Sequence, residues 1–133
     1  MGKTNKKKAV VIRSKIWLQD AEGNPVFGQG RLRILTAIEE HGSISAAARA
    51  LHMSYLGAWR RIQATEERLG RPLLTRTMGG STGGGSTLTP FARELLERFR
   101  RLSELTEKQV DQAYEELFPE FTGKRMPKAP SKA

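Results

Sequence analysis

The sequence predicts an α+β fold that is mostly α: a winged helix-turn-helix with an N-terminal β-hairpin and a long C-terminal dimerisation helix. Three observations predict it. A short alanine-rich helix, a turn and a longer helix follow one another between residues 43 and 69. A glycine-rich stretch then separates two short apolar segments between residues 73 and 88, as in a wing. A threonine-proline pair finally begins a periodic segment that reaches residue 117.

The bulk properties indicate one globular domain. The 133 residues suffice for a single core, and 38% of them are apolar while 28% are charged. No apolar run approaches the roughly 20 residues of a membrane span, and residues 1–8 lack the apolar core of a signal peptide. The absence of cysteine excludes disulfides and thiolate metal sites and fits a reducing cytoplasm. We therefore expect a cytoplasmic protein with no membrane partner.

The N-terminal hairpin is predicted from an alternation of two. Residues 1–8 are basic and polar, and we expect them to be disordered. Residues 9–18 are rich in β-branched and aromatic side chains, which favours a strand. Residues 22–25 (Glu-Gly-Asn-Pro) signal a turn, and residues 26–27 can return as a short second strand.

Two helices come next. Residues 31–41 carry an apolar stripe at steps of three, and Gly42 is a stop signal. Ser43 or Ser45 can cap a short helix over residues 46–51, because a serine hydroxyl accepts from a free N–H of the first turn. The alanines of this helix are small enough to let the following helix approach closely.

A third helix follows a turn at residues 52–53 and runs from a cap at Ser54 to about Leu69. Trp59 borders its apolar face and is expected to be structural. Its core face carries Ala58, Ile62, Thr65 and Leu69, whereas Leu56, Arg60, Gln63 and Glu67 point away. Because the second helix of a helix-turn-helix enters the major groove of DNA, the outward side is the predicted reading surface.

The wing is predicted from two short strand candidates, residues 73–77 and 86–88, around a loop over residues 79–85. A P-loop would need a lysine before the serine or threonine and a helix immediately afterwards. Neither is present, so we expect this loop to offer backbone N–H groups to a DNA phosphate rather than to hold a nucleotide.

The last helix starts at Thr89 and Pro90 and can run to residue 117, about 42 Å at 1.5 Å per residue. One small domain cannot bury so long a seam, so we expect a homodimer. The predicted dimer interface comprises Leu95, Phe99, Leu102, Thr106, Gln109, Ala113 and Leu117. Residues 119–133 are expected to be a disordered Pro/Lys tail, which leaves residues 9–118 as the domain and residues 89–118 as its dimerisation helix.

Positive charge is concentrated on the predicted reading unit. The net charge is +9, and residues 49–78 hold six arginines against two glutamates. Both terminal segments are basic, whereas residues 104–118 hold five acids against one lysine. This distribution favours a polyanion as partner. For the terminal segments alone, lysines that merely aid solubility are an equal alternative.

The candidate contacts to double-stranded DNA lie around the third helix and the wing. Arg60 is the better candidate for guanine O6 and N7, and a solvated surface arginine is the alternative. Ser54 can be a cap, a contact or both, and Arg76 can meet a phosphate or remain a strand-edge charge. The candidate set is Ser43, Ser45, Ser54, Tyr55, Leu56, Gly57, Arg60, Arg61, Gln63, Arg76, Gly80, Ser81, Thr82 and Gly83.

No pattern in the sequence argues for catalysis. His41 and His52 lie in or beside turns without clustered metal ligands, and no nucleophile, base and acid form a set. We expect no enzyme activity, no cofactor, no metal, and no small-molecule or oxyanion site.

Several separated motifs match one known family in order. Residues 42–48 read Gly-Ser-Ile-Ser-Ala-Ala-Ala, residues 53–55 Met-Ser-Tyr and residues 58–59 Ala-Trp, before Ile62. Pro-Leu at 72–73, Gly-Gly-Ser-Thr-Gly-Gly-Gly at 79–85 and Leu-Thr at 88–89 complete the match. Over about residues 10–115 the chain resembles the N-terminal domain of ModE-type molybdate-responsive regulators, which is related to the LysR-type winged helix-turn-helix.

The resemblance implies a homodimeric repressor or activator whose long helix pairs two subunits and whose second motif helix reads DNA. In ModE proteins molybdate binds a separate C-terminal module, and this chain ends before such a module or a LysR co-inducer domain. We therefore expect a regulator without its own molybdate-binding domain. Leu56 and Gly57 stand where the family often has polar or basic residues, and Ser81 and Thr82 where a lysine is common. The operator need not be the family's own.

The predicted function is sequence-specific binding of double-stranded DNA in transcription regulation, in the nucleoid of the cytoplasm. A non-specific architectural DNA-binding protein is one alternative, favoured by the short chain and basic tails. A protein-interaction adaptor with a winged-helix fold is the other. Competition with bulk DNA distinguishes the first alternative, and the absence of salt-sensitive nucleic-acid affinity distinguishes the second.

Overall fold

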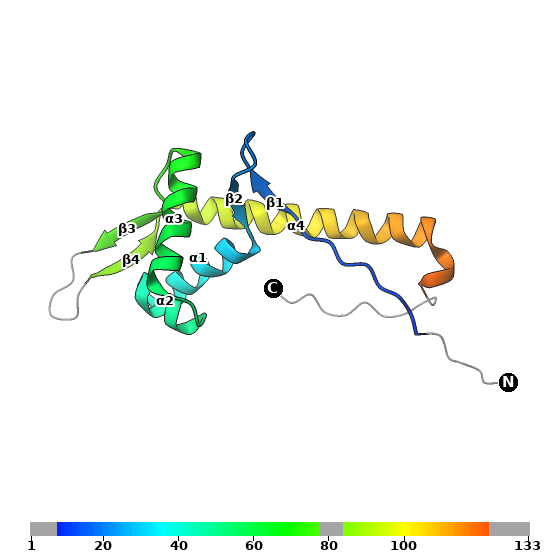
Figure 1. Cartoon of the computed structure of the whole chain (residues 1–133), viewed down its shortest axis with the longest axis horizontal. Helices are drawn as coiled ribbons and strands as arrows, with labels where there is room; N and C mark the ends of the chain where they lie inside the picture. The colour runs from blue at the N-terminus through cyan, green and yellow to red at the C-terminus, as the bar shows by residue number, and fades with distance from the viewer. Residues whose placement is uncertain (1–7, 78–83, 123–133) are drawn as a thin grey trace. The chain divides into compact units, whose positions relative to one another are not determined.

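The computed structural model describes residues 8–77 and 84–122 of the chain. These residues divide into two compact units, one formed by residues 16–101 and the other by the segments before and after it. The first unit contains two β-hairpins and three helices, together with the beginning of a fourth helix (Figure 1). It confirms the predicted winged helix-turn-helix with an N-terminal hairpin.

The N-terminal hairpin pairs β1 (Trp17–Gln19) antiparallel with β2 (Pro25–Gly28). In the turn between them, the Asp20 carboxylate accepts hydrogen bonds from the backbone and side chain of Asn24, which hold the pKa of Asp20 below its usual range. The predicted strand over residues 9–18 was too long, because residues 9–16 have no regular structure. Alternating side chains alone do not make a strand, and β2 pairs with only three residues of β1.

Helices α1 (Gln29–His41) and α2 (Ile44–Ala50) meet at the predicted stop. Gly42 has a φ of 87°, a left-handed conformation that favours glycine. Of the two proposed caps, Ser43 is the one used: its hydroxyl accepts from the N–H of Ala46 at 3.0 Å. As a result α2 begins two residues earlier than predicted.

Helix α3 (Tyr55–Leu69) is bounded as predicted. The Ser54 hydroxyl accepts from the N–H of Gly57 at 2.9 Å, and Gly70 ends the helix with a φ of 72°. The preceding turn bends through His52, the one non-glycine residue with positive φ in the described chain. The predicted core face is confirmed by three buried residues, Ala58, Ile62 and Thr65.

One apolar core joins the hairpin, the three helices and the wing. At one end the rings of Phe27 and Phe99 meet edge to face with centroids 5.3 Å apart. Trp59 packs against the core as expected. The least exposed large side chains are Phe27, Leu35, Ile38, Ile62, Leu73 and Thr65.

The wing strands β3 (Leu74–Thr77) and β4 (Gly85–Leu88) pair antiparallel in register. The predicted tip lies outside the described residues except for its last two glycines. Strand β4 passes so close to the end of α1 that a methyl group on Gly85 would lie 2.9 Å from the carbonyl oxygen of Gly42. The N–H of Ser86 donates to that same oxygen at 2.8 Å, which fixes the wing on the helical body.

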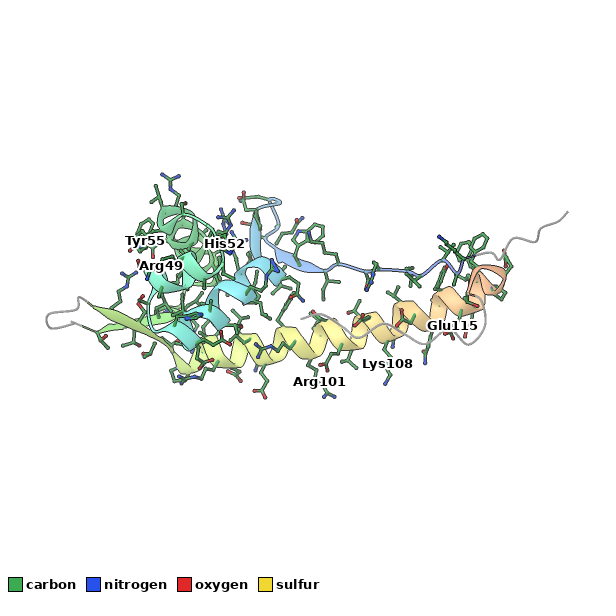
Figure 2. All side chains as sticks on the ribbon, turned by 90° about the horizontal axis from the view of Figure 1, so that it is seen from below. Arg49, His52, Tyr55, Arg101, Lys108 and Glu115 are labelled. Carbon is green, nitrogen blue, oxygen red and sulfur yellow. The ribbon has the colours of Figure 1, made fainter. Side chains whose placement is uncertain are left out.

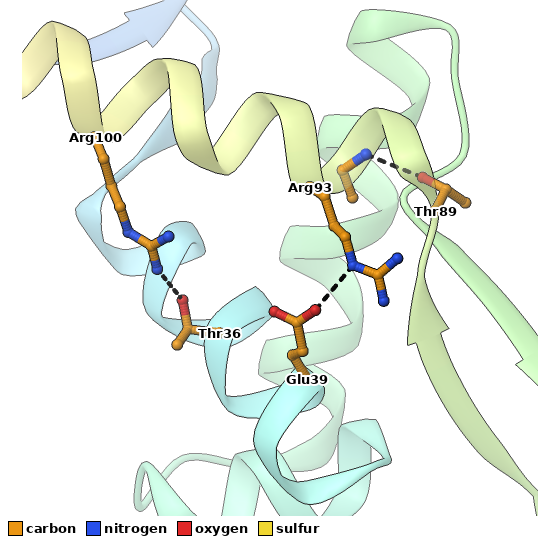
Figure 3. A network of polar contacts seen from close by, with 6 residues as sticks. Thr36, Glu39, Thr89, Arg93 and Arg100 are labelled. Atoms are coloured by element: carbon orange, nitrogen blue, oxygen red, sulfur yellow. Dashed lines mark hydrogen bonds and ion pairs between the residues drawn. The ribbon is translucent and has the colours of Figure 1, made fainter.

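Helix α4 (Pro90–Leu117) starts where Thr89 caps it, with the Thr89 hydroxyl accepting from the N–H of Ala92. Its first turns are tied to α1 by two polar contacts (Figure 3). Arg93 Nε lies 2.9 Å from Glu39 Oε2, and an Arg100 guanidinium nitrogen lies 3.1 Å from the Thr36 hydroxyl.

One residue of the predicted dimer seam packs inside its own chain instead. Phe99 is 2% exposed and packs in the chain's own core, so its side chain is not available to a second copy. Leu95 is half-buried against the same core. Spacing of four and three along a helix marks an apolar stripe, but it does not say whether the stripe is covered by the same chain or by another.

The second unit contains residues 8–15 and 102–122. The N–H of Val10 donates to the carbonyl of Phe121 at 3.0 Å, and the Tyr114 hydroxyl donates to the carbonyl of Val10. A short 3-10 turn, η1 (Pro119–Phe121), follows α4, and the rings of Phe118 and Phe121 stack 5.5 Å apart. Regular structure thus reaches residue 121, three residues beyond the predicted domain end. Among the described residues no helix has the length and apolar character of a membrane span.

Candidate nucleic-acid interface

The outward side of the α2–α3 motif exposes cationic, aromatic and aliphatic side chains. Tyr55 and Leu56, in the first turn of α3, are 49% and 48% exposed. Tyr55 lies at the same end of the motif as Arg49 and His52, which are also exposed (Figure 2). Exposed aromatic and aliphatic side chains at the start of a cationic helix are suited to base edges, including the methyl group of thymine.

The two adjacent arginines of α3 differ in how they are held. Arg61 turns back along the helix, and its Nη1 donates to the carbonyl of Gly57 at 3.0 Å. Arg60 is exposed, and no hydrogen bond or ion pair joins it to the described residues. An unengaged guanidinium retains all five of its N–H donors for a ligand. Of the two, Arg60 therefore remains the better candidate for a base contact, and that contact stays a prediction.

Three of the predicted contacts have structural roles in the fold. The hydroxyls of Ser43 and Ser54 are engaged as helix caps, and Ser43 is also half-buried. The N–H of Gly57 is the donor in the Ser54 cap, and a methyl group on Gly57 would lie 2.9 Å from that hydroxyl. Ser45, by contrast, is exposed in the first turn of α2.

The remaining candidates are spread over α3 and the wing. Gln63 is half-buried, so it presents less of its amide than Arg60 presents of its guanidinium. Arg76 is exposed on β3, where it is paired with Ser86 in the register of the wing. The tip residues Gly80, Ser81, Thr82 and Gly83 lie outside the described residues.

The structure also brings together a cluster of arginines. Arg61 is the one member of this cluster that was among the predicted DNA contacts. The Nε of Arg31, in the first turn of α1, donates to the carbonyl of Arg61 at 3.3 Å. The pKa of Arg31 is lowered, first by burial and then by the positive charges of Arg61 and Arg68. The spacing of seven between Arg61 and Arg68 places them on one side of α3, a signal that the sequence does carry. No spacing rule relates Arg31 to them, because it lies on another helix.

Three helices followed by a two-stranded wing, with a cationic third helix facing outward, define the winged helix-turn-helix class. The model of the bacterial regulatory helix-turn-helix proteins of the LysR family matches residues 30–93. The chain belongs to this family, and the curated relatives it matches include ModE regulators and molybdenum-pterin-binding proteins.

Two relatives illustrate the match. The chain is 35% identical over 104 residues to the molybdenum transport protein ModE of Azotobacter vinelandii, covering 78% of this chain and 38% of that protein. It is 40% identical over 77 residues to the transcriptional regulator ModE of Haemophilus influenzae, covering 58% of this chain and 30% of that protein. The chain thus spans well under half the length of either relative.

A solved structure gives the same fold. The DNA-binding domain of CbnR, crystallised as a complex with DNA, superposes with a TM-score of 0.52 at 33% identity. The match covers 66% of this chain and 95% of that domain. That domain supports both the family assignment and the fold of the first unit.

Proposed function

We propose that the protein is a sequence-specific regulator of transcription that binds double-stranded DNA as a homodimer. The observation that carries the proposal is Arg60, an exposed and unengaged guanidinium on the outward side of the second motif helix. The CbnR domain, to which the first unit is similar, was crystallised with DNA. The proposal includes no catalysis and no cofactor, and it places the protein on the bacterial chromosome in the cytoplasm.

In the proposed complex α3 lies in the major groove. Arg60 donates two hydrogen bonds to guanine O6 and N7, which discriminates against other bases by about 1–3 kcal/mol. Leu56 lies one turn earlier on the same side of the helix, so its methyl groups contact a thymine methyl near that guanine. Ser45 and Arg76, together with the wing tip, hold phosphates and position the helix.

In the proposed dimer two copies pair along α4. The contacts are made by the predicted interface residues other than Phe99. Exposed apolar side chains continue along the second half of the helix, with Leu102 and Leu105 at 43% and 48% exposure. Two reading helices related by a two-fold axis require half-sites about 34–36 Å apart, or a multiple of that spacing. In this proposal the lysines of the basic segments at the two ends of the chain add affinity without specificity.

The test is selection of bound duplexes from a random pool, followed by affinity measurements on the selected site. We expect Arg60→Ala to lose about tenfold to a hundredfold in affinity for the site while binding to bulk DNA changes less. Arg98→Ala is the matched control, because Arg98 is also exposed but lies on α4 beside Glu94. If Arg60→Ala kept the sequence selectivity of the wild type, the proposal that α3 recognises the bases would be rejected.

A second arm tests the thymine contact. Replacement of thymine by deoxyuridine removes only the C5 methyl group, so we expect weaker binding to the wild type and little change for Leu56→Ala. Failure of the wild type to retain any duplex in dilute buffer would reject DNA binding altogether. Loss of the selected site to bulk competitor DNA would leave the architectural alternative instead.

A further inference from the structure

The two flanks of α3 face different hairpins. On one flank, the Glu66 carboxylate accepts from the N–H of Leu73 at 2.7 Å, at the entrance to the wing. On the other flank, an Arg68 guanidinium nitrogen donates to the carbonyl of Pro25 in β2. Figure 1 shows the wing and the N-terminal hairpin on opposite sides of this helix. Arg61 lies two turns before Arg68, and therefore on the hairpin flank.

Three guanidiniums on the hairpin flank are held in place by backbone carbonyls. Arg31, Arg61 and Arg68 each donate one hydrogen bond to a carbonyl, those of Arg61, Gly57 and Pro25 respectively. A guanidinium has five N–H donors, so each retains further donors for a ligand. Because the side chains are anchored, less conformational entropy is lost when they bind one.

Within the described residues no carboxylate is hydrogen-bonded to these guanidiniums. The arginines found in ion pairs there, Arg93 with Glu39 and Arg98 with Glu94, lie outside the cluster. Asp20 offsets part of the charge of Arg68, although its oxygens accept from the N–H groups of Asn24 and Glu22 and not from a guanidinium. One nearby carboxylate leaves the three guanidiniums with a net positive charge, so they repel one another in the free protein, and an anion relieves that repulsion.

The N-terminus of α1 adds to the positive electrostatic potential at this cluster. Arg31 lies in the first turn of a 13-residue helix that has no side-chain cap and no acidic residue in that turn. A cation at the positive end of a helix dipole is destabilising in the free protein. Gly30, beside it, has open space around its α-carbon, which leaves room for a ligand to approach the backbone.

The dimensions of DNA indicate which anion this cluster binds. The major groove is about 12 Å wide and an α-helix with side chains is about 10–12 Å across, so a strand of phosphates runs along each flank of an inserted helix. In the proposed complex the wing contacts the strand on its own flank. We propose that Arg31, Arg61 and Arg68 form a phosphate-binding site for the other strand. This inference rests on the proposed function, since it requires α3 to lie in the groove.

The test is the salt dependence of affinity for one duplex, measured with the full chain. Each phosphate neutralised contributes about 0.9 to the slope of log affinity against log salt concentration. We expect Arg31→Gln to lower the slope by about 1 and to weaken selected and random duplexes equally, by roughly an order of magnitude at 0.1 M salt. Arg98→Gln, which removes the same charge from an exposed arginine on α4, should leave the slope nearly unchanged.

A charge-reversed variant separates binding from folding. Arg31→Glu places a carboxylate beside Arg61 and Arg68, so we expect its melting temperature to equal or exceed that of the wild type while its DNA affinity falls further than in Arg31→Gln. Unchanged slopes in both variants, with wild-type DNA binding intact, would overturn the phosphate site. Absence of wild-type binding would instead overturn the proposed function.

Inorganic phosphate distinguishes DNA from a free oxyanion as the ligand. A lone phosphate lacks the other contacts of a duplex, so we expect its binding to be too weak for millimolar phosphate at constant ionic strength to raise the melting temperature of the wild type more than that of Arg31→Gln. A wild-type increase that is lost in Arg31→Gln would assign the cluster to a free oxyanion and contradict the DNA assignment.

Discussion

The two halves of α4 share one helix and one apolar periodicity, but they are buried to different extents. In residues 90–101, Ala92, Leu96 and Phe99 are buried in the core of the first unit. In residues 102–117, Leu102, Leu105 and Leu117 are exposed. Periodicity therefore identifies an apolar stripe without identifying what covers it. The first half stabilises the domain itself, and the second half is where the proposed dimer would form.

The largest expected effect comes from the buried half. Phe99→Ala removes a ring that packs on Phe27, so we expect a loss of about 3–5 kcal/mol in the free energy of unfolding. Urea denaturation followed by circular dichroism measures it. Leu102→Ala, at a protein concentration low enough to keep the chain monomeric, should change that free energy by no more than about 0.5 kcal/mol. Equal losses would mean that both halves are covered within one chain.

The next effect concerns association. Leu102→Asn or Leu117→Asn should weaken dimerisation by about 1.5–3 kcal/mol each, which is roughly tenfold to a hundredfold in dissociation constant, while the monomer stays folded. Sedimentation equilibrium across a concentration series measures the constant. Lys108→Asn lies on the same half of the helix outside the predicted seam and serves as the control. A wild type that remains monomeric at high concentration would reject the α4 interface.

A smaller effect is expected where α4 begins. Thr89→Ala removes the hydroxyl that accepts from the N–H of Ala92 and donates to the carbonyl of Pro72. We expect a loss of about 1 kcal/mol, since a missing cap leaves an N–H of the first turn unsatisfied. Thr89→Ser retains the hydroxyl and should recover most of the loss in a thermal melt. Equal melting temperatures for the alanine and serine variants would show that the cap contributes nothing.

The smallest effect comes from the polar contacts between α1 and α4. Arg93 and Glu39 pair across the two helices with side chains that are 55% and 44% exposed, so water screens their attraction. A double-mutant cycle with Arg93→Gln and Glu39→Gln should give a coupling of about 0.2–1 kcal/mol that declines in high salt. A coupling above this range, unaffected by salt, would indicate that the pair is effectively buried.

Local signals in the sequence predicted most of the elements and the outward side of α3. Gly42 and Gly70 end their helices in the left-handed conformation, and Ser54 and Thr89 cap the helices that follow them. These signals work because a helix end has unsatisfied groups that neighbouring residues in sequence can satisfy. The exposure of Arg60 followed from helical periodicity in the same way.

The errors arose where the outcome depends on partners distant in sequence. Residues 9–16 alternate like a strand but do not pair with another strand, and Phe99 continues the α4 seam but is covered by Phe27. The contact between Arg31 and Arg61 joins residues thirty positions apart on different helices. Hydrogen bonds between residues that are close in sequence depend on the local sequence alone. The caps, the turns and the outward side of α3 were therefore predictable. Burial and the clustering of like charges depend on which elements pack together, and only the tertiary structure decided them.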